Sequence, residues 1–373
     1  MKPTNPFSTA GYTGPETFCD RQAETKDLLD AIENGRNVTL VAPRRLGKTG
    51  LVKHVFHRLE RKDRTPTIYA DVLAAQNLAD FTRIFAGAVF GALDTSLEKA
   101  VAKVARLFRS CRPTITYDGV SGAPTLSVDF APDRADATLR EVFAYLGSKN
   151  RPCAVAIDEF QQVSLFPEKG TEALLRSYVQ SVPQVRFVFA GSREHLMRDM
   201  FLSSKRPFYQ STQMLSIGPI DRGAYRAFAS RFFREDGRPL APEAFDWIYD
   251  TFDGVTWYVQ AALNRLFGRR AVPGDLEGAR RAVVELVREN TYNFSRLLEE
   301  YPAGAVRLLR AIAREGHAAQ PTSGAFLAAH SLRAPSSVAV SLRKLLDKEI
   351  VRKDERGYFV DDRLLSLWLR DNP

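Results

Sequence analysis

A short apolar run that leads into a lysine-containing loop constrains the fold of this chain more than any other feature. Residues 37–42 (Asn-Val-Thr-Leu-Val-Ala) are typical of a buried strand, and Gly47-Lys48-Thr49 comes soon after them. From Leu51 to Leu59 apolar residues recur at helical spacing, which predicts an amphipathic helix. Further strands and helices alternate downstream, so the pattern favours an α/β fold with a parallel sheet.

The loop between this strand and this helix has the composition of an anion-binding turn. The pattern GxxxxGK[ST] surrounds phosphate groups with backbone amides, the positive end of a helix and a lysine ammonium. Its end is intact here, whereas Ala42 stands where the first glycine would be. We expect Lys48 to be the main phosphate contact, and an ordinary strand, turn and helix is the alternative. The residues expected to bind nucleotide are Pro43, Arg44, Arg45, Leu46, Gly47, Lys48, Thr49 and Gly50.

Two adjacent carboxylates give a second, independent signal. Asp158 and Glu159 follow the apolar run 153–157, at the carboxyl end of a predicted strand, where open α/β sheets bind their ligands. The hydroxyl of Thr49 is expected to bind Mg²⁺ and Asp158 to hold it through its water shell, while Glu159 orients and deprotonates an attacking water. A solvated acidic pair is the alternative. The combination predicts hydrolysis of a nucleoside triphosphate and not binding alone.

Two further kinds of side chain are candidates for the same chemistry. Ser192 follows the predicted strand 185–190, where its hydroxyl would lie near the γ-phosphate or the attacking water, and a plain turn residue is the alternative. An arginine supplied by this chain or by a neighbouring subunit can stabilise charge on the transferred phosphate. The candidates are Arg193, Arg198 and Arg206.

Cysteine and histidine spacing argues against a structural metal or a disulfide framework. Cys19, Cys111 and Cys153 lie far apart and form no CxxC pair. His54 and His57 are one helical turn apart, but two further ligands are not evident, so a solvated helix face is the preferred interpretation.

The order of predicted elements divides the chain into three domains. Residues 1–220 form the α/β core, with an insertion at about 75–135 that contains a β-hairpin over 113–130. Residues 221–299 are helical and predict a lid, which ends in one helix around Leu276 to Arg296. Residues 300–373 read as three helices followed by a β-hairpin over 350–360, the pattern of a winged helix-turn-helix. The predicted core strands are 37–42, 67–72, 153–157, 185–190 and 214–217.

Charge and composition bound the partners. The chain has 53 Lys and Arg against 44 Asp and Glu, a net charge of +9, which permits binding to nucleic acid without requiring it. The predicted recognition helix at 336–348 and the wing after it offer side chains for phosphate or base contacts, interrupted by four acidic residues. These side chains are Ser336, Ser337, Ser341, Arg343, Lys344, Arg352, Lys353 and Arg356. No run approaches the roughly 18 apolar residues of a membrane span, and residues 1–6 lack the apolar centre of a signal peptide. We therefore expect a cytoplasmic protein without a membrane partner.

Several segments together carry a family likeness. The segments are 5–7, 18–24, 42–49, 156–161, 190–197, 206–209, 252–260 and 358–369. They resemble the archaeal-type ATPases, P-loop proteins of the AAA+/STAND assemblage. The resemblance implies a P-loop NTPase fold of the ASCE/AAA+ type with strand order 5-1-4-3-2, a helical lid and a C-terminal winged helix. It also implies ATP and Mg²⁺ as ligands, and Arg21 near the adenine. Relatives carry Gly-x-Pro in the lid, and here Thr256 stands in place of the proline.

Two functions remain open on this basis. In the first, an ATPase moves its lid with the nucleotide state and so repositions the winged helix, which binds double-stranded DNA. In the second, bound ATP or ADP controls assembly into a homo-oligomer or recruitment of a protein partner through the C-terminal domain. Salt-sensitive DNA retention that depends on ATP favours the first, and nucleotide-dependent oligomerisation without DNA binding favours the second.

Overall fold

The chain forms two compact units. The computed structural model describes residues 5–93, 101, 106, 108–117, 124–149, 152–269 and 272–372. One unit comprises residues 10–220, and the other joins residues 5–9 to residues 221–372. The segment 5–9 thus belongs with the C-terminal unit and not with the predicted core of 1–220. The reason is Phe7, whose ring is fully buried against the rings of Phe233 and Phe267.

A five-stranded parallel sheet organises the first unit. Its strands run in the order β2-β5-β6-β1-β7, which is 5-1-4-3-2 when the five are numbered along the chain and read from the other edge. Strand β6 lies between β1 and β5, with Val188 in register with both Val38 and Ala156. The loops that leave β1 and β5 therefore flank the end of β6 at the same edge of the sheet. The bounds are β1 Val38–Val41, β2 Thr67–Asp71, β5 Cys153–Asp158, β6 Val185–Gly191 and β7 Gln213–Ser216.

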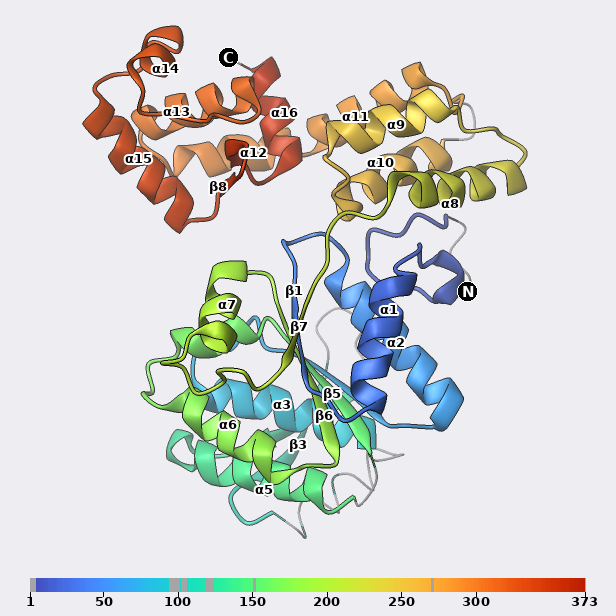
Figure 1. Ribbon diagram of the computed structural model, residues 1–373, viewed down its shortest axis with the longest axis vertical. Coiled ribbons are helices and arrows are strands. Elements are labelled where there is room, and N and C mark those ends of the chain that lie inside the picture. Colours follow the sequence, from blue (N-terminus) through green and yellow to red (C-terminus); the bar gives the residue numbers. More distant parts are fainter. Residues whose placement is uncertain are drawn as a thin grey trace. The chain divides into compact units, whose positions relative to one another are not determined.

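Helices cover both faces of this sheet. Helices α1 and α2 lie on one face, and α3, α5 and α6 lie on the other (Figure 1). The apolar positions of α2 that repeat at helical spacing, Leu51 and Val55 among them, are fully buried. On the opposite face Phe85 of α3 stacks on Phe143 of α5, which in turn stacks near Phe187 of β6. The bounds are α1 Gln22–Glu33, α2 Lys48–Asp63, α3 Leu78–Leu93, α5 Ala135–Gly147, α6 Thr171–Ser181 and α7 Glu194–Leu202.

The predicted insertion contains the expected hairpin. Strands β3 (Arg112–Tyr117) and β4 (Pro124–Asp129) pair in antiparallel fashion, and their connecting residues lie outside the described part of the chain. Val128 is buried in the core, whereas Ile115 is half exposed. The helix predicted over 97–108 lies almost wholly outside the described residues. Short 3-10 helices occur at Pro15–Thr17, Pro132–Arg134 and Phe160–Leu165.

The lid helices of the second unit follow one another closely. They are α8 Arg222–Glu235, α9 Pro242–Thr251, α10 Thr256–Gly268 and α11 Leu276–Glu289. The prediction of one continuous helix from Leu276 to Arg296 is wrong, because α11 ends at Glu289 and α12 (Thr291–Glu299) begins after Asn290. The side-chain amide of Asn290 donates to the Leu286 carbonyl, and such a bond competes with continuation of the helix.

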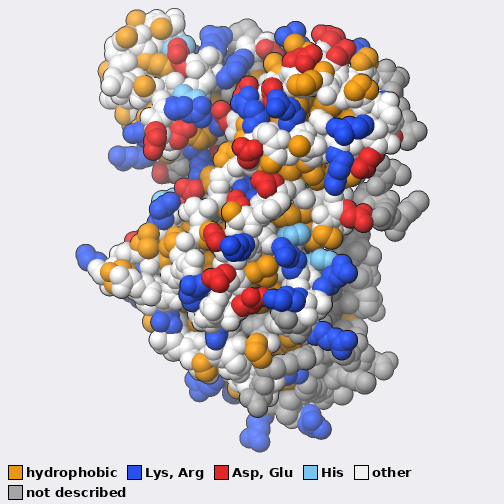
Figure 2. All heavy atoms as spheres, turned by 45° about the vertical axis from the view of Figure 1, so that its right-hand side comes forward, with side chains coloured by type: hydrophobic (Ala, Val, Ile, Leu, Met, Phe, Trp, Pro, Cys, Tyr) orange, Lys and Arg blue, Asp and Glu red, His pale blue; other side chains and the backbone are white. Residues whose placement is uncertain are grey.

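The last helices and strands build the winged helix. Helices α13 (Ala303–Glu315), α14 (Gly324–Ala329) and α15 (Pro335–Asp347) precede strands β8 (Val351–Asp354) and β9 (Gly357–Val360). A final helix, α16 (Arg363–Asp371), was not predicted; its first turn is capped by the Asp362 carboxylate, which accepts from two backbone amides. Among the described residues, no helix combines the length and apolar character that crossing a membrane requires. Basic and acidic side chains are interspersed over the visible face (Figure 2).

Candidate functional site

The loop between β1 and α2 has the backbone of an anion-binding turn. Helix α2 begins at Lys48, directly after Gly47, which has a φ of 90°, and Arg45 has a φ of 69°. These left-handed residues bend the chain around the start of the helix. Ala42 is fully buried and is not among the described residues with positive φ. Alanine in place of the motif's first glycine therefore causes no backbone strain here.

Lys48 joins the loop to the acidic pair. Its side chain is 7% exposed, and its Nζ lies 2.8 Å from Oδ1 of Asp158 and 3.0 Å from Oε1 of Glu159. An ammonium has three donors, so one remains for a further acceptor at the same point. The phosphate loop and the two carboxylates, which are more than a hundred residues apart in sequence, thus form one site.

Asp158 also binds the first turn of α2. The hydroxyl of Thr49 donates to Oδ2 of Asp158 over 2.7 Å, and the hydroxyl of Tyr69 on β2 donates to the same oxygen over 2.6 Å. Thr49 gives its one proton to Asp158 and keeps its lone pairs for another ligand. These oxygen groups suit a hard divalent cation: the Thr49 hydroxyl could bind Mg²⁺ directly, and Asp158 could hold it through the water molecules that surround the metal.

Glu159 is held by Ser192, which follows β6, and by Gln161, which lies two residues further along the chain. Oε2 of Glu159 accepts from the hydroxyl of Ser192, 2.7 Å away, and from the side-chain amide of Gln161, 2.5 Å away. Glu159 itself has a φ of 57°, a conformation that is uncommon for a residue other than glycine. Ser192 is 4% exposed and follows β6. Sequence spacing predicted Ser192 near this site, whereas it gave no signal for Gln161 or Tyr69.

Electrostatics keep both carboxylates ionised. Burial raises the pKa of Asp158, but the Lys48 ammonium and hydrogen bonds from Lys48, Tyr69 and Thr49 outweigh burial and leave the pKa below its ordinary value. Burial likewise raises the pKa of Glu159. The Lys48 ammonium and the hydrogen bonds from Gln161, Ser192 and Lys48 outweigh burial, so the pKa of Glu159 also lies below its ordinary value. Glu159 is thus a carboxylate able to accept a proton at neutral pH.

Arg21 contacts the backbone of the loop between β1 and α2. Its side chain is 4% exposed, and it donates to the carbonyl of Leu46 and to the carboxylate of Glu24, each over 2.9 Å. Arg21 itself begins α1 with a φ of 59°. Both contacts lie on protein groups, one of them on the backbone of the loop itself. The guanidinium therefore fixes the position of the Leu46 carbonyl next to Gly47.

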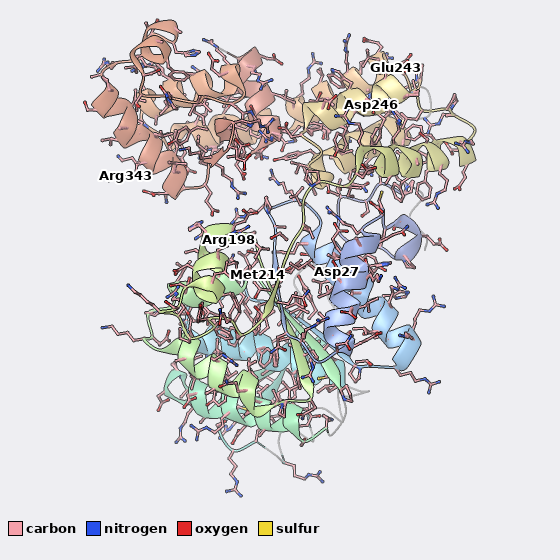
Figure 3. The ribbon with its side chains drawn as sticks, in the orientation of Figure 1. Asp27, Arg198, Met214, Glu243, Asp246 and Arg343 are labelled. Atoms are coloured by element: carbon pink, nitrogen blue, oxygen red, sulfur yellow. The ribbon has the colours of Figure 1, made fainter. Side chains whose placement is uncertain are left out.

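Among the arginine candidates, Arg193 directly follows Ser192 and is partly buried, whereas Arg198 lies on α7 and Arg206 follows it. The Arg206 guanidinium lies 3.2 Å from the Glu172 carboxylate of α6 and 3.0 Å from the Asp199 carboxylate of α7. The structure does not place it in contact with Lys48, Asp158 or Glu159. Arg198 is exposed on α7 (Figure 3). Arg44 and Arg45 of the loop are exposed as well.

The solvated helix face expected for His54 and His57 is not observed, because both side chains are partly buried and Nε2 of His57 is buried. The His54 ring stacks on Phe18 with centroids 4.1 Å apart, and its Nδ1 lies 3.3 Å from the Tyr12 hydroxyl. In the part of the chain that the structure describes, no group of three or more His, Cys, Asp or Glu side chains is arranged to hold a metal. All three cysteines are buried, and none is joined in a disulfide.

A second candidate surface lies on the winged helix. A groove of about 510 Å³ runs between the loop 319–323, α15 and the wing formed by β8 and β9. Arg343 of α15 and Lys353 of β8 line it, together with Asp347. Arg343 projects from α15 (Figure 3), and it and the neighbouring Lys344 are exposed and make no ion pair with any described carboxylate.

Other cations of the wing are engaged within the same unit. Arg356 lies 3.4 Å from Asp253, which stands in the turn before α10, and Arg363 lies 2.9 Å from the same carboxylate. Arg352 pairs with Asp361 over 3.5 Å. Asp253 therefore connects the turn before α10 to the wing and to α16 through ion pairs. These pairs leave fewer basic side chains available to an outside partner than the sequence suggests.

Comparisons with known proteins agree with both regions. The profile of a family described as an ATPase domain predominantly from Archaea matches residues 18–261, and that of a probable winged helix domain matches residues 292–371. No curated protein matches the chain.

Solved structures share the fold over nearly the whole chain. A Walker-type ATPase of Pyrococcus abyssi is 19% identical with a TM-score of 0.65, and the match covers 98% of this chain and 99% of that one. The ORC2 protein of Aeropyrum pernix, solved in ADPNP-ADP complexes, is 17% identical with a TM-score of 0.60 and coverage of 98% and 95%. The ORC1 protein of the same organism, solved with DNA, is 16% identical with a TM-score of 0.54 and coverage of 99% and 97%. These likenesses confirm a P-loop NTPase fold.

Proposed function

Because the chain belongs to the family of ATPase domains found predominantly in Archaea and ends in a winged helix domain, we propose that it hydrolyses ATP with Mg²⁺ and uses the nucleotide state to reposition that winged helix. The observation that carries this proposal is the contact of the Lys48 ammonium with both Asp158 and Glu159, at 2.8 and 3.0 Å. A single Mg²⁺-nucleotide can touch the loop and the acidic pair only if the two are adjacent, and they are.

The residues divide the work of hydrolysis among them. The backbone of the loop and the ammonium of Lys48 bind the β- and γ-phosphates, while Thr49 and Asp158 hold the metal. Mg²⁺, when bound, neutralises charge that develops on the phosphate oxygens. Ser192 and Gln161 orient the Glu159 carboxylate through the hydrogen bonds that they donate to it.

Glu159 is the proposed general base. A water molecule attacks the γ-phosphorus and gives its proton to Glu159; the new oxygen–phosphorus bond forms as the bond to the bridging oxygen of ADP breaks. The products are ADP and inorganic phosphate, and the proton then leaves Glu159 to solvent. The lowered pKa of Glu159 keeps this base ionised at neutral pH.

The proposed output is contact between the winged helix and double-stranded DNA. Arg343, Lys344 and Lys353 supply outward-facing cations on and beside the groove between α15 and the wing. Cations in this position contact phosphates and base edges in winged helix-turn-helix proteins. Asp347 in the same groove would repel a phosphate, so contact is expected toward Arg343 and Lys344.

One observation favours the alternative, in which the winged helix contacts protein and the nucleotide controls assembly. Arg356 of the wing and Arg363 of α16 already bind Asp253 of the lid turn, so part of this domain serves a protein contact within the chain. A homo-oligomer or a protein partner would then take the place of DNA.

One experiment separates these functions. Phosphate release from ATP is measured with Mg²⁺ and with EDTA, and the protein is then sized with ADP or a non-hydrolysable ATP analogue, with and without duplex DNA. We expect Mg²⁺-dependent phosphate release and ATP-dependent, salt-sensitive retention of DNA. Absence of phosphate release would contradict the ATPase, and a change of size with nucleotide but without DNA retention would favour the assembly switch.

A further inference from the structure

Tyr69 is a component of the site that no motif marks. It lies on β2, at the edge of the sheet, in register with Ala156 of β5. Ala156 is two residues before Asp158, so the Tyr69 side chain extends along the neighbouring strand toward the carboxyl end of β5. Its hydroxyl reaches Oδ2 of Asp158 at 2.6 Å.

The carboxylate of Asp158 is fixed by four donors, and Tyr69 is one of them. Oδ1 accepts from Nζ of Lys48 at 2.8 Å and from the backbone amide of Glu159 at 3.0 Å. Oδ2 accepts from Thr49 at 2.7 Å and from Tyr69 at 2.6 Å. Each oxygen thus uses its two lone-pair directions, which sets the rotation of the carboxylate group. Of the four donors, Tyr69 alone belongs to neither the phosphate loop and its helix nor the acidic pair.

The Tyr69 ring has a second attachment. Nζ of Lys53, on the same helix as Thr49 and one turn farther along, lies 5.1 Å from the centre of the ring. A cation over the face of an aromatic ring is attracted to it. The phenol is thus held at its ring by α2 and at its hydroxyl by Asp158, and it connects β2 to the proposed metal ligands.

The geometry points to Tyr69 as a positioning residue for the magnesium ion: its hydroxyl fixes the orientation in which Asp158 meets the metal. This inference rests on the proposed function, because it concerns how this chain holds the metal of its nucleotide. Tyr69 contacts no reacting atom in this arrangement and acts through Asp158. Partners one step removed from a metal, when they orient its ligands, typically change metal affinity by 10- to 100-fold.

The test separates the affinity for nucleotide from the affinity for metal. Tyr69→Phe removes only the hydroxyl and keeps the ring under Lys53. Tyr178→Phe is the matched control, since Tyr178 also donates its hydroxyl to an aspartate, Asp136, on helices of the same unit away from the site. Binding of ADP is measured by calorimetry in EDTA and over a series of Mg²⁺ concentrations, and the binding of Mn²⁺ to the ADP complex is followed by electron paramagnetic resonance.

We expect Tyr69→Phe to bind ADP in EDTA within twofold of the wild type, and to need roughly tenfold more Mg²⁺ or Mn²⁺ for half-saturation. Tyr178→Phe should match the wild type in both measurements. In an Asp158→Asn background the additional Tyr69→Phe change should lose most of its effect on the metal.

Three results would overturn the inference. An unchanged metal requirement in Tyr69→Phe would remove the positioning role alone and leave the proposed function intact. An equal loss of ADP affinity in EDTA and in Mg²⁺ would show that the hydroxyl supports the structure of the whole site and not the metal. Failure of the wild-type protein to bind ADP under either condition would remove the proposed function and this inference with it.

Discussion

The nucleotide site and the winged-helix groove both present lysine and arginine, but they do so in opposite ways. At the nucleotide site a single cation, Lys48, is 7% exposed and is in contact with two carboxylates. On the winged helix Arg343 and Lys344 are exposed and have no ion-pair partner among the described residues. Buried charges interact strongly and only at fixed geometry, whereas exposed charges interact weakly, at longer range and under the control of salt.

Buried and exposed cations are therefore suited to different kinds of binding. A buried lysine selects one anion in one position, so its removal should be severe and nearly independent of salt. Exposed cations add small, similar contributions, so their removal should be mild and should change the salt dependence. The net charge of +9 does not distinguish the two cases, because the two wing arginines, Arg352 and Arg356, form ion pairs within the chain.

The largest effect is expected for Lys48→Ala. Without its direct cation the phosphate binding site should lose measurable affinity for ATP and ADP, and calorimetric titration checks this. Lys62→Ala, near the end of the same helix, is the matched control and should bind as the wild type does, since Lys62 is exposed and pairs with Glu33 at the surface. Unchanged ATP affinity in Lys48→Ala would remove this lysine from the site.

The next largest effect is expected for Glu159→Gln. The amide keeps the size of the side chain but cannot accept the proton of the attacking water, so turnover should fall by roughly 100- to 1000-fold while ATP stays bound. Phosphate release and ATP affinity are measured on the same preparation. A normal rate of phosphate release would show that the base is a different group.

An intermediate effect concerns stability and pH. The folded pKa values of Asp158 and Glu159 lie below their ordinary values, so the stabilisation they give is complete above about pH 4.5 and is lost as pH falls through the lower folded values. Lys48→Met removes the cation that lowers both pKa values, and leaves the buried Asp158 and the partly buried Glu159 without a counter-charge. At pH 7 its first thermal transition should lie roughly 5 °C below that of the wild type.

Acidification should then narrow the difference between the two proteins. As pH falls below about 4.5 the wild type loses a contribution that Lys48→Met never had, so their thermal midpoints should converge. Thermal unfolding followed by circular dichroism over this range checks the sign. Lys62→Met should stay within about 1 °C of the wild type at every pH, because exposed ion pairs contribute little. A gap that widens in acid would contradict the assigned pKa directions.

The smallest effect is expected on the winged helix. Replacement of both Arg343 and Lys344 by alanine should weaken DNA retention about tenfold at low salt and lower the slope of log affinity against log salt by about 2. Arg296→Ala is the control, since Arg296 is exposed on α12 but pairs with Glu299. Equal retention and an equal slope in the double variant would place DNA contact elsewhere or favour the protein-contact alternative.

The sequence predicted those parts of the site that follow from chain order. Parallel strands share one edge for their carboxyl ends, so Lys48 after β1, Asp158 at the end of β5 and Ser192 after β6 had to approach one another once the strand order was known. The contact between Tyr69 and Asp158 depends on which strand lies beside β5 and on a side chain that reaches two residues along it. The residue pattern of 67–71 indicates neither the neighbouring strand nor the reach of the Tyr69 side chain.

The same distinction explains the fold predictions. Apolar periodicity located the five core strands and the hairpin over 113–130, since burial on a sheet imposes that periodicity. Apolar periodicity also predicted a single helix where the structure has α11 and α12. The apolar pattern continues across Asn290, but the helical backbone is interrupted there. The same analysis assigned residues 5–9 to the core, although Phe7 is buried in the other unit, a choice that only tertiary packing makes.

A crystal structure of the protein with Mg²⁺, ADP and beryllium fluoride would test the joint site most directly. The γ-phosphate mimic is expected within hydrogen-bond distance of the Lys48 ammonium, with the metal between Thr49 and Asp158 and a water molecule between the mimic and Glu159. A nucleotide bound with its phosphates away from the Lys48 loop, or with Asp158 and Glu159 turned away from it, would contradict the account.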